Sequence, residues 1–324
     1  SDYMKILVTG GAGYIGSHVV LDLIEKDHEV LILDDLTSGN RNNISSDATF
    51  IEGSTLDENF LNNCLSGQID AVIHLAASKA AAESMLSPEK YSKNNIIGTL
   101  NLLNAMIKNN IETIVFSSSA SVYGFPKYLP LDEKHPTQPI NYYGHTKLAI
   151  EQYLQWYSAL KGLNFVSLRY FNAAGYDNKG RIIGLEKNPA NLLPIVMEVA
   201  KKERSELKIF GNNYNTDDGT AVRDYIHVTD LASAHFKALN YLQNRKNLTL
   251  NLSTGKGYSV LNIIEKAKEV TGMEIPYSIV NRRPGDPDSL IANPKLAQKT
   301  LDWVPENTKL NHLLESMWNI YKNN

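Results

Sequence analysis

The chain has 324 residues, of which 43% are hydrophobic, and its formal net charge is −3 at pH 7. This length can bury a large core in two lobes, and the nearly balanced charge gives no electrostatic reason to expect nucleic acid or an anionic membrane as a partner. No apolar run approaches the roughly 20 residues of a membrane span, and no signal-peptide pattern is evident, so we expect a cytoplasmic protein. The single cysteine, Cys64, excludes an internal disulfide and a cysteine-based metal cluster, and we predict no metal site.

The chain begins with a buried strand pattern that leads directly into a glycine-rich turn. Residues 4–9 are predicted to form the strand, and an apolar helix pattern follows the turn. Gly11, Gly13 and Gly16 match the dinucleotide fingerprint, whose glycines allow a tight turn, close approach of the backbone to a pyrophosphate and tight packing of helix on strand. The free amides at the start of the helix would then face the phosphates.

The second predicted strand, residues 29–33, leads into Asp34, which follows the glycines by about 20 residues. A carboxylate at this position accepts hydrogen bonds from the adenosine ribose hydroxyls and repels a 2′-phosphate. The sequence therefore favours NAD over NADP as the cofactor.

Short apolar strand patterns alternate with helix patterns near residues 4–9, 29–33, 48–52, 70–75, 113–117 and 164–169. This alternation predicts an α/β fold with a Rossmann-type, doubly wound parallel sheet covered by helices on both faces. Beyond residue 172 the chain becomes rich in Gly, Asn and Pro. We therefore predict an NAD-binding domain at 4–172, with a returning segment near 225–252, and a smaller mixed C-terminal lobe made mainly of 173–324.

Helix signals are clear in two later parts of the chain. Ser87-Pro88 is an N-cap residue followed by proline, and the helix pattern then runs toward Asn109. Residues 259–272 read as a second capped helix, from a serine to a glycine. The helix after Ser87 and the one near Tyr143 could pair with their copies in a second subunit, so we expect a homodimer.

Some tyrosines are followed four residues later by a lysine: Tyr123/Lys127, Tyr143/Lys147 and Tyr157/Lys161. Only Tyr143 opens a helix pattern, which places Lys147 one turn on along the same face, where an ammonium lowers the pKa of a phenol. Pro126 interrupts the first pair, and the third lies about 20 Å further along the same helix at 1.5 Å per residue. Tyr143 and Lys147 are therefore the candidates for proton transfer coupled to redox chemistry.

The carboxyl ends of the strands, where such a sheet binds ligands, carry small and polar residues. The fifth strand leads into Ser117-Ser118-Ser119, whose hydroxyls are expected above the sheet. The fourth is followed by Ala76 and Ala77, where a flat nicotinamide fits, with Lys79 at its edge.

Motifs along nearly the whole chain now point to one family: 9–16, Lys79 with 83–84, 94–95 with 98–99, 117–124, 143–147, 169–172, 218–228 and 282–286. On these motifs the chain resembles the extended short-chain dehydrogenase/reductase family, and within it the UDP-galactose (UDP-glucose) 4-epimerases. The resemblance implies interconversion of UDP-galactose and UDP-glucose by transient 4′-oxidation by bound NAD, rotation of the 4-ketosugar and return of the hydride. It implies Tyr143 as the base, Ser119 as its hydrogen-bonding partner and Lys147 as a support for Tyr143 and the nicotinamide ribose.

The resemblance also implies which residues bind each ligand. For NAD these are Gly10, Gly13, Tyr14, Ile15, Gly16, Asp34, Asp35, Leu36, Thr37, Ser38, Gly39, Ser54, Thr55, Leu75, Ala76, Ala77, Lys79, Asn94, Ser117, Tyr143, Lys147 and Phe171. For the UDP-sugar they are Lys79, Ser119, Tyr143, Asn172, Asn191, Leu192, Lys208, Ile209, Phe210, Arg223, Arg283, Asp286 and Leu290. Because the ketosugar must turn over, we expect arginines to clamp the diphosphate while the sugar is held loosely.

The chain departs from the family pattern at two positions. Ser54-Thr55 stand where the family usually has an aspartate that accepts from the adenine amino group, and a hydroxyl accepts more weakly than a carboxylate. Leu290 occupies the position that walls the sugar pocket, where a bulky tyrosine accompanies plain hexoses and smaller residues accompany N-acetylated ones. A 4-epimerase acting mainly on UDP-GlcNAc/UDP-GalNAc or another UDP-sugar is therefore an open alternative.

Two other functions are compatible with the fold. A nucleotide-sugar 4,6-dehydratase carries an Asp-Glu pair for its elimination step where this chain has Ala120-Ser121. A non-catalytic NAD-binding regulator would have no reason to keep Tyr143, Lys147 and Ser119 together. Turnover of UDP-galactose distinguishes these alternatives from the epimerase.

Overall fold

The computed structural model describes residues 3–244 and 247–324. Residues 245–246, which belong to the predicted returning segment, and residues 1–2 lie outside the described residues.

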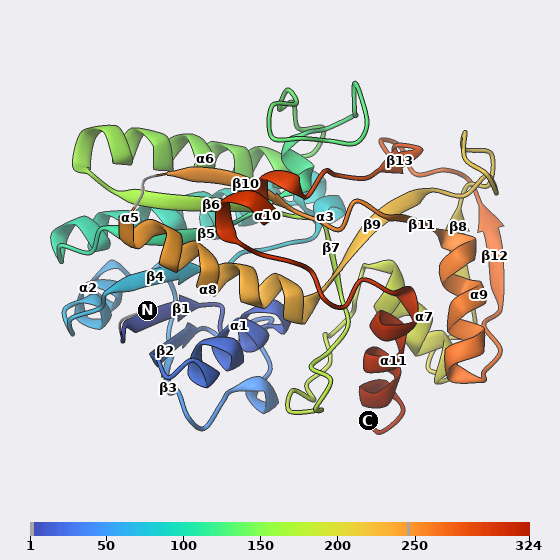
Figure 1. Cartoon of the computed structure of the whole chain (residues 1–324), viewed down its shortest axis with the longest axis horizontal. Helices are drawn as coiled ribbons and strands as arrows, with labels where there is room; N and C mark the ends of the chain where they lie inside the picture. The colour runs from blue at the N-terminus through green and yellow to red at the C-terminus, as the bar shows by residue number, and fades with distance from the viewer. Residues whose placement is uncertain (1–2, 245–246) are drawn as a thin grey trace.

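A twisted parallel sheet forms the larger part of the molecule (Figure 1). Its strands are β1 (Lys5–Thr9), β2 (Glu29–Asp34), β3 (Thr49–Glu52), β4 (Ala71–His74), β5 (Thr113–Ser119), β6 (Asn164–Tyr170) and β10 (Leu248–Leu252). They follow the order β10-β6-β5-β4-β1-β2-β3, and every neighbouring pair is parallel. The order reverses between β1 and β4, which is the switch point where doubly wound sheets bind ligands. The predicted α/β fold and its strands are confirmed.

Helices cover both faces of this sheet because its strands are apolar on both sides. On β1, Ile6 and Val8 face α1 (Tyr14–Glu25) and α8 (Val228–Asn244), whereas Leu7 faces the opposite core. The helices of that opposite core are α2 (Glu58–Leu65), α5 (Gly98–Lys108) and α6 (Tyr142–Lys161). From the C-terminal part of the chain, α10 (Lys295–Leu301) and Trp303 join the core that contains α1 and α8.

The helix predicted from residue 87 toward 109 is not a regular α-helix throughout. A separate short helix, α3 (Ala81–Leu86), comes before this region. The region itself forms the short helix α4 (Pro88–Tyr91) and then a π-helical segment, η2 (Ser92–Ile97), before α5 begins. Such segments frequently occur at functional sites, and this one contains Asn94. Short 3-10 turns, η1 (Arg41–Asn43) and η3 (Ala120–Val122), follow β2 and β5.

The second lobe lies to the right of the large sheet in Figure 1. A mixed sheet places β9 (Val222–His227) beside β7 (Asn172–Ala174), β11 (Gly257–Ser259) and β13 (Ser289–Leu290). A separate parallel pair joins β8 (Leu207–Phe210) to β12 (Tyr277–Val280). The second core is built from α7 (Leu192–Ala200), α9 (Val260–Thr271) and α11 (Leu310–Tyr321). As predicted, α9 begins after a Ser259 cap and ends at Gly272, whose φ is 67°.

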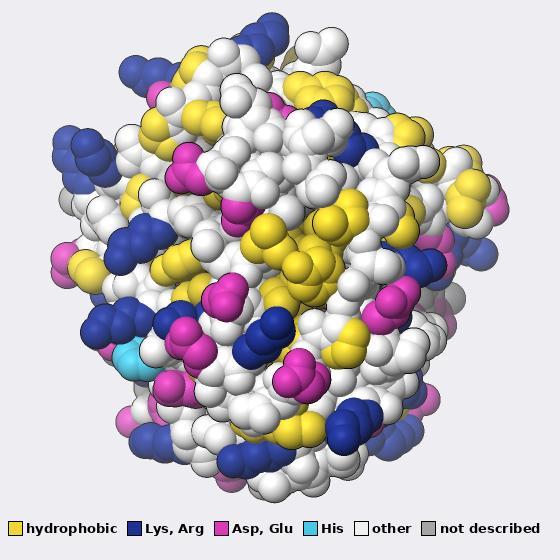
Figure 2. Space-filling model, turned by 90° about the vertical axis from the view of Figure 1, so that its right-hand side faces the viewer, with side chains coloured by type: hydrophobic (Ala, Val, Ile, Leu, Met, Phe, Trp, Pro, Cys, Tyr) yellow, Lys and Arg dark blue, Asp and Glu magenta, His cyan; other side chains and the backbone are white. Residues whose placement is uncertain are grey.

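The outer face of this lobe carries a small hydrophobic patch among interspersed acidic and basic side chains (Figure 2). Exposed hydrophobic residues on β8 and β12 are Phe210, Tyr277 and Ile279. Within residues 3–244 and 247–324, no helix is both long and apolar enough to cross a membrane.

Candidate active site

The glycine-rich turn between β1 and α1 forms an open cradle at the carboxyl edge of the sheet. Gly10 has φ of 73°, and a Cβ there would lie 2.8 Å from the backbone nitrogen of Ala76. A Cβ at Gly16 would lie 2.0 Å from the Gly10 carbonyl oxygen, so only glycine permits this close packing of α1 on the turn. No described side chain caps α1, which leaves the first amides of the helix without partners inside it.

Asp34 holds the cradle together from the end of β2. One carboxylate oxygen accepts the amide of Ala12 at 3.0 Å, and the other accepts the amide of Leu36 at 2.9 Å. The loop that follows folds back on it, since a Cβ on Gly39 would lie 2.8 Å from Asp34 Oδ1. Burial raises the pKa of Asp34, and these backbone hydrogen bonds lower it. The predicted loop residues Asp35, Leu36, Thr37, Ser38 and Gly39 therefore lie beside the glycine-rich turn.

In Tyr14 and Ser54, which are also predicted cofactor residues, the polar side-chain atoms already have hydrogen-bond partners within the protein. The Tyr14 hydroxyl donates to the Gly175 carbonyl at 2.5 Å, so it already has a partner within the protein. Ser54 Oγ already accepts the Leu56 amide at 3.1 Å, and Thr55 is buried against Gly98. Ser54 is thus a weaker acceptor than the aspartate usual in the family, and its oxygen already accepts one hydrogen bond within the protein.

The segment after β4 lies beside the cradle. Leu75 and Ala76 donate their amides to Thr9 Oγ1 at 3.0 and 3.2 Å, which fixes this turn against β1. Ala77 follows, and Asn94 reaches back from η2 to Ser78 Oγ at 3.0 Å. Lys79 follows this turn as an exposed residue. Lost hydration lowers the pKa of its ammonium, whereas Glu186 and Asp34 raise it.

These residues fit a dinucleotide. The cradle has glycine where any side chain would collide, and uncapped helix amides suited to a pyrophosphate. Asp34 retains acceptor capacity on both oxygens beyond its two amide bonds. No group of His, Cys, Asp or Glu suited to a metal ion occurs among the described side chains.

Tyr143, Ser119 and Lys147 come together where β5 ends and α6 begins. The Tyr143 phenol is close enough to Ser119 for hydrogen bonding between them to lower the pKa of the phenol, and Lys147 Nζ lies 5.9 Å from the centre of the Tyr143 ring. Lys147 donates to the Ser117 carbonyl oxygen at 2.8 Å. The sequence-predicted trio is therefore one cluster in space.

The influence of Lys147 on Tyr143 differs from the sequence-based expectation. Burial raises the pKa of Tyr143, and the opposing influence is the hydrogen bond with Ser119. Burial, followed by repulsion from Lys79, lowers the pKa of Lys147 to about 7. The same loss of hydration thus acts on both groups, and the expected effect of the ammonium on the phenol is not the dominant one.

A buried ion pair that the sequence did not reveal fixes α6 on the sheet. Arg169 from β6 binds both oxygens of Glu151 from α6, at 3.0 and 2.6 Å, and Ser118 donates to the same carboxylate at 2.5 Å. Arg169 also donates to the Tyr123 hydroxyl at 2.9 Å. Tyr123 therefore has a structural partner.

A cavity of about 200 Å³ in the second lobe collects most of the predicted substrate residues. Its lining includes Asn172, Asn191, Leu192, Lys208, Ile209, Phe210, Arg223, Arg283 and Asp286. Ile209 is 2% exposed, and its side chain packs in the core of this lobe. Tyr225 and Val260 also line the cavity and were missed, because residues of β9 and α9 meet there only in the folded chain.

The arginines of this cavity are held differently. Arg283 donates to Asp286 at 2.9 Å and its guanidinium lies 4.5 Å from the centre of the Phe210 ring. Arg223 donates to the Val222 carbonyl at 2.8 Å, and among the described residues no carboxylate forms an ion pair with it. Burial lowers the pKa of Arg223, and Asp286 raises it. A cation without a close counter-charge inside a cavity suits an anionic ligand.

Leu290 and Phe171 pack together. Both belong to a small apolar cluster with Val122, Leu131 and Ala292. Leu290 is also the register partner of Arg223 in the pairing of β13 with β9. Leu290 is therefore next to both the predicted nicotinamide residue and the arginine of the cavity.

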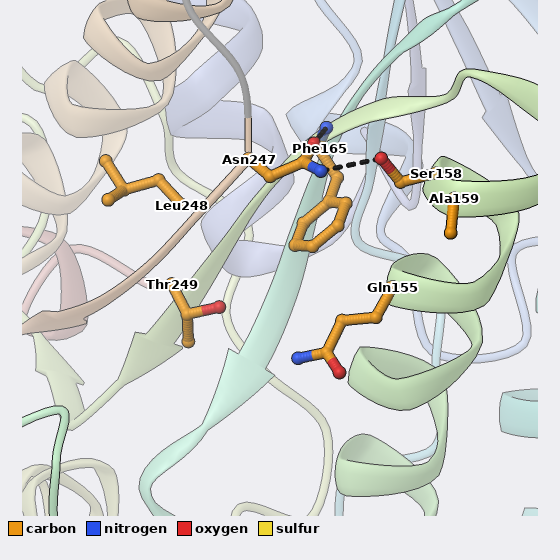
Figure 3. Close-up of a pocket in the computed structure, with 7 residues that line it drawn as sticks. All are labelled: Gln155, Ser158, Ala159, Phe165, Asn247, Leu248 and Thr249. Atoms are coloured by element: carbon orange, nitrogen blue, oxygen red, sulfur yellow. Dashed lines mark hydrogen bonds between the residues drawn. The ribbon is translucent and has the colours of Figure 1, made fainter.

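A second hollow, of about 400 Å³, lies beside α6 (Figure 3). It is bounded by Gln155, Ser158 and Ala159 of α6 and by Phe165 and residues 247–249. Gln155 is about 18 Å along α6 from Tyr143 at 1.5 Å per residue. Asn247 donates to Ser158 across it at 2.6 Å. None of the described residues that line it is charged.

Comparison with known proteins decides among the families that share this fold. A model described as the NAD dependent epimerase/dehydratase family matches residues 6–253. The chain belongs to the NAD-dependent epimerase/dehydratase family. A UDP-glucose 4-epimerase from Halalkalibacterium halodurans is 47% identical over 322 residues, covering 98% of this chain and 96% of that protein.

Solved structures extend the similarity within the epimerase/dehydratase family. A UDP-glucose 4-epimerase from Brucella ovis in complex with NAD superposes with a TM-score of 0.96 at 38% identity, covering 98% of both chains. One from Bifidobacterium longum in complex with NAD⁺ and UDP gives a TM-score of 0.93 at 38% identity, covering 99% of this chain and 98% of that one. Both lobes of the chain thus follow the fold of these family members.

Proposed function

We propose that the protein interconverts UDP-galactose and UDP-glucose by oxidising and reducing C4′ of the sugar with a resident NAD. The arrangement that carries the proposal is the Tyr143, Ser119 and Lys147 cluster, in a chain that also has a dinucleotide cradle at the carboxyl edge of the large sheet and a cavity containing Arg223. Its first test is incubation of the purified protein with UDP-galactose without added NAD, which should yield UDP-glucose. A 4-keto-6-deoxy product would indicate a dehydratase instead, and absence of turnover would indicate a regulator.

NAD would be held along the carboxyl edge of the large sheet. The first amides of α1 suit its pyrophosphate and Asp34 suits the adenosine ribose, while Lys79, Asn94 and Lys147 would hold the rest of the dinucleotide. Ser117 and Phe171 would border the nicotinamide. When bound, NAD supplies a reversible acceptor for the hydride from C4′.

Tyr143 would remove the proton from the 4′-hydroxyl during oxidation and return it during reduction. Its position in the first turn of α6 favours the phenolate, because the positive end of the helix dipole lies there. Ser119 also favours the phenolate by its hydrogen bond and would align the sugar hydroxyl. Lys147 would hold the cofactor ribose and add positive charge when protonated.

Replacement of Ser119 by alanine should reveal its effect on the phenol. Since the Ser119 hydrogen bond lowers the pKa of Tyr143, its removal should raise that pKa and move the acidic limb of the kcat profile to higher pH. We expect kcat near neutral pH to fall roughly 10- to 100-fold, with a smaller loss at alkaline pH. A kcat profile with an unchanged acidic limb would contradict this role.

The substrate would be gripped at its nucleotide end and held loosely at its sugar. Arg223 and Arg283 would bind the diphosphate, and Asn172, Asn191, Asp286 and the 208–210 strand would surround the uridine. Leu290 would form part of the sugar pocket. Its intermediate size keeps the N-acetylated UDP-sugars as the alternative substrates, and side-by-side assays of UDP-galactose and UDP-GalNAc would separate the two.

Ser54→Asp should strengthen NAD binding, because a carboxylate accepts the adenine amino group more strongly than the hydroxyl now present. A charged hydrogen bond has roughly twice the strength of a neutral one, so we expect the dissociation constant for NAD to fall about fivefold. Titration of NAD into protein stripped of cofactor measures this, with Ser54→Ala as the weakening control. Equal affinities in all three proteins would place the adenine elsewhere.

A homodimer is proposed from the outer surfaces of α5 and α6. Trp156 and Leu160 on α6 are 64% and 69% exposed, and Ile97 before α5 is 49% exposed. Large exposed apolar side chains are typical of subunit contacts. Light scattering should give twice the 36.1 kDa chain mass, and Trp156→Glu should shift the protein toward the monomer. A monomeric native protein would contradict the dimer.

We also propose a cytoplasmic location, where NAD and nucleotide sugars are available.

A further inference from the structure

The first turn of α6, which carries Tyr143, is attached to a neighbouring helix through its backbone. The amide of Tyr143 donates to Ser84 Oγ of α3 at 2.9 Å, and the next amide, of Gly144, donates to its own N-cap residue Asn141 at 2.8 Å. Amides in the first turn have no partner inside a helix. A side chain from elsewhere in the chain thus satisfies the amide of the residue that bears the phenol.

The Ser84 hydroxyl has a single orientation. It is fully buried, and it donates its proton to the Ala81 carbonyl oxygen at 2.6 Å. A hydroxyl has one proton and two acceptor positions, so its oxygen is left to accept the Tyr143 amide. The same bond that fixes the hydroxyl within α3 therefore directs its lone pair at α6.

Tyr91 holds α3 in place behind this contact. Its hydroxyl accepts the Ala80 amide at 2.8 Å and donates to Glu83 at 2.9 Å, so it binds α3 at both sides of Ala81. The buried Tyr91 ring meets the Tyr143 ring edge to face, with centroids 6.4 Å apart and planes at 88°. Tyr91 thus supports both the helix that carries Ser84 and the ring of Tyr143.

The same turn also contacts the segment that follows Ser119. A Cβ on Gly144 would lie 2.5 Å from the Ser121 carbonyl oxygen, so α6 is in direct contact with that segment. Ser121 is itself tied to Ser119, whose Oγ accepts its amide at 3.0 Å. The turn bearing Tyr143 is therefore held by contacts with both Ser84 and the Ser119 segment.

We propose that Ser84 is a positioning residue for Tyr143, whose amide it holds so that the phenol stays in hydrogen-bond contact with Ser119. This rests on the proposed role of Tyr143 as the base. Loss of the Ser84 contact would let the turn shift, and a misplacement on the order of 1 Å can lower a catalytic rate by about 100-fold. Tyr91 supports the same contact because it holds α3, the helix that carries Ser84, in place.

The test compares Ser84→Ala with Ser84→Thr, which keeps the hydroxyl. For Ser84→Ala we expect kcat to fall about tenfold and its acidic limb to move to higher pH, with the KM and the NAD content unchanged. Ser84→Thr should restore most of the rate. Ser92→Ala is the matched control, because the Ser92 hydroxyl contacts the side chain of the adjacent Tyr142 and leaves the Tyr143 amide alone.

A double-mutant cycle with Tyr143→Phe separates this proposal from the proposed function. If Ser84 acts through the phenol, Ser84→Ala should have no further effect on the residual rate of Tyr143→Phe. An equal tenfold loss in both backgrounds, or a fall in thermal stability with an unchanged kcat and pH profile, would overturn the positioning role. Near-normal turnover of Tyr143→Phe alone would reject the proposed function instead. If Ser84→Ala does not fold, Tyr91→Phe, which keeps the ring and loses both hydroxyl contacts, tests the same prediction.

Discussion

Tyr143→Phe is expected to lower kcat by about three orders of magnitude while NAD remains bound. The phenylalanine ring can keep its edge-to-face contact with Tyr91, and the dinucleotide cradle does not involve the lost oxygen. Only the group that exchanges the proton of the 4′-hydroxyl disappears, and such groups contribute typically 10²–10⁴-fold to the rate. The measurement is kcat for UDP-galactose, with bound NAD quantified after denaturation.

Tyr157→Phe is the matched control on the same helix. It has the same spacing to a lysine, but its hydroxyl donates to Asn104 at 2.7 Å, remote from the cradle. Its kcat should match that of the unaltered protein. Comparable rates for the two phenylalanine variants would remove Tyr143 from the mechanism.

Arg223→Met should raise the KM for UDP-galactose at least about thirtyfold and change kcat only slightly. Arg223 lines the cavity without an ion-pair partner among the described residues, so the substrate diphosphate would be its counter-charge. Removing one partner of such a hydrogen-bonded charge pair costs about 2–5 kcal/mol, and 2 kcal/mol corresponds to about thirtyfold at 1.4 kcal/mol per factor of ten. Steady-state kinetics and UDP titration measure the change.

Arg204→Met removes a cation from the same lobe outside the cavity and provides the control. Arg204 is partly exposed and pairs with Glu198 at 3.1 Å, so the KM should stay unchanged. A similar KM for both variants would show that Arg223 does not bind the diphosphate.

Features encoded by neighbouring residues were predictable from the sequence. The strands of the large sheet are short apolar runs, and the turn after β1 needs glycine at Gly10 and Gly16 for steric reasons that the motif already contains. The clustering of Tyr143 and Lys147 follows from helical spacing, and that of Ser119 follows from the shared carboxyl edge of the sheet. Each of these depends on local order or on topology alone.

Features that depend on distant side chains were not predictable in the same way. Arg169 and Glu151 are separated by 18 residues and Ser84 and Tyr143 by 59, and no local pattern marks either pair. The π-helical η2 interrupts a sequence that reads as continuous helix. The pKa values of Tyr143 and Lys147 depend on burial, which is a property of the packed cleft.

The most direct test of the account is the fate of a deuterium label at C4′. UDP-galactose carrying deuterium at C4′ is incubated with the purified protein, without added NAD, and the UDP-glucose formed is analysed by mass spectrometry and NMR. The account predicts full retention of deuterium at C4′, because the hydride leaves and returns within one site while only the hydroxyl proton passes through Tyr143. Formation of UDP-glucose with solvent hydrogen at C4′ would contradict it.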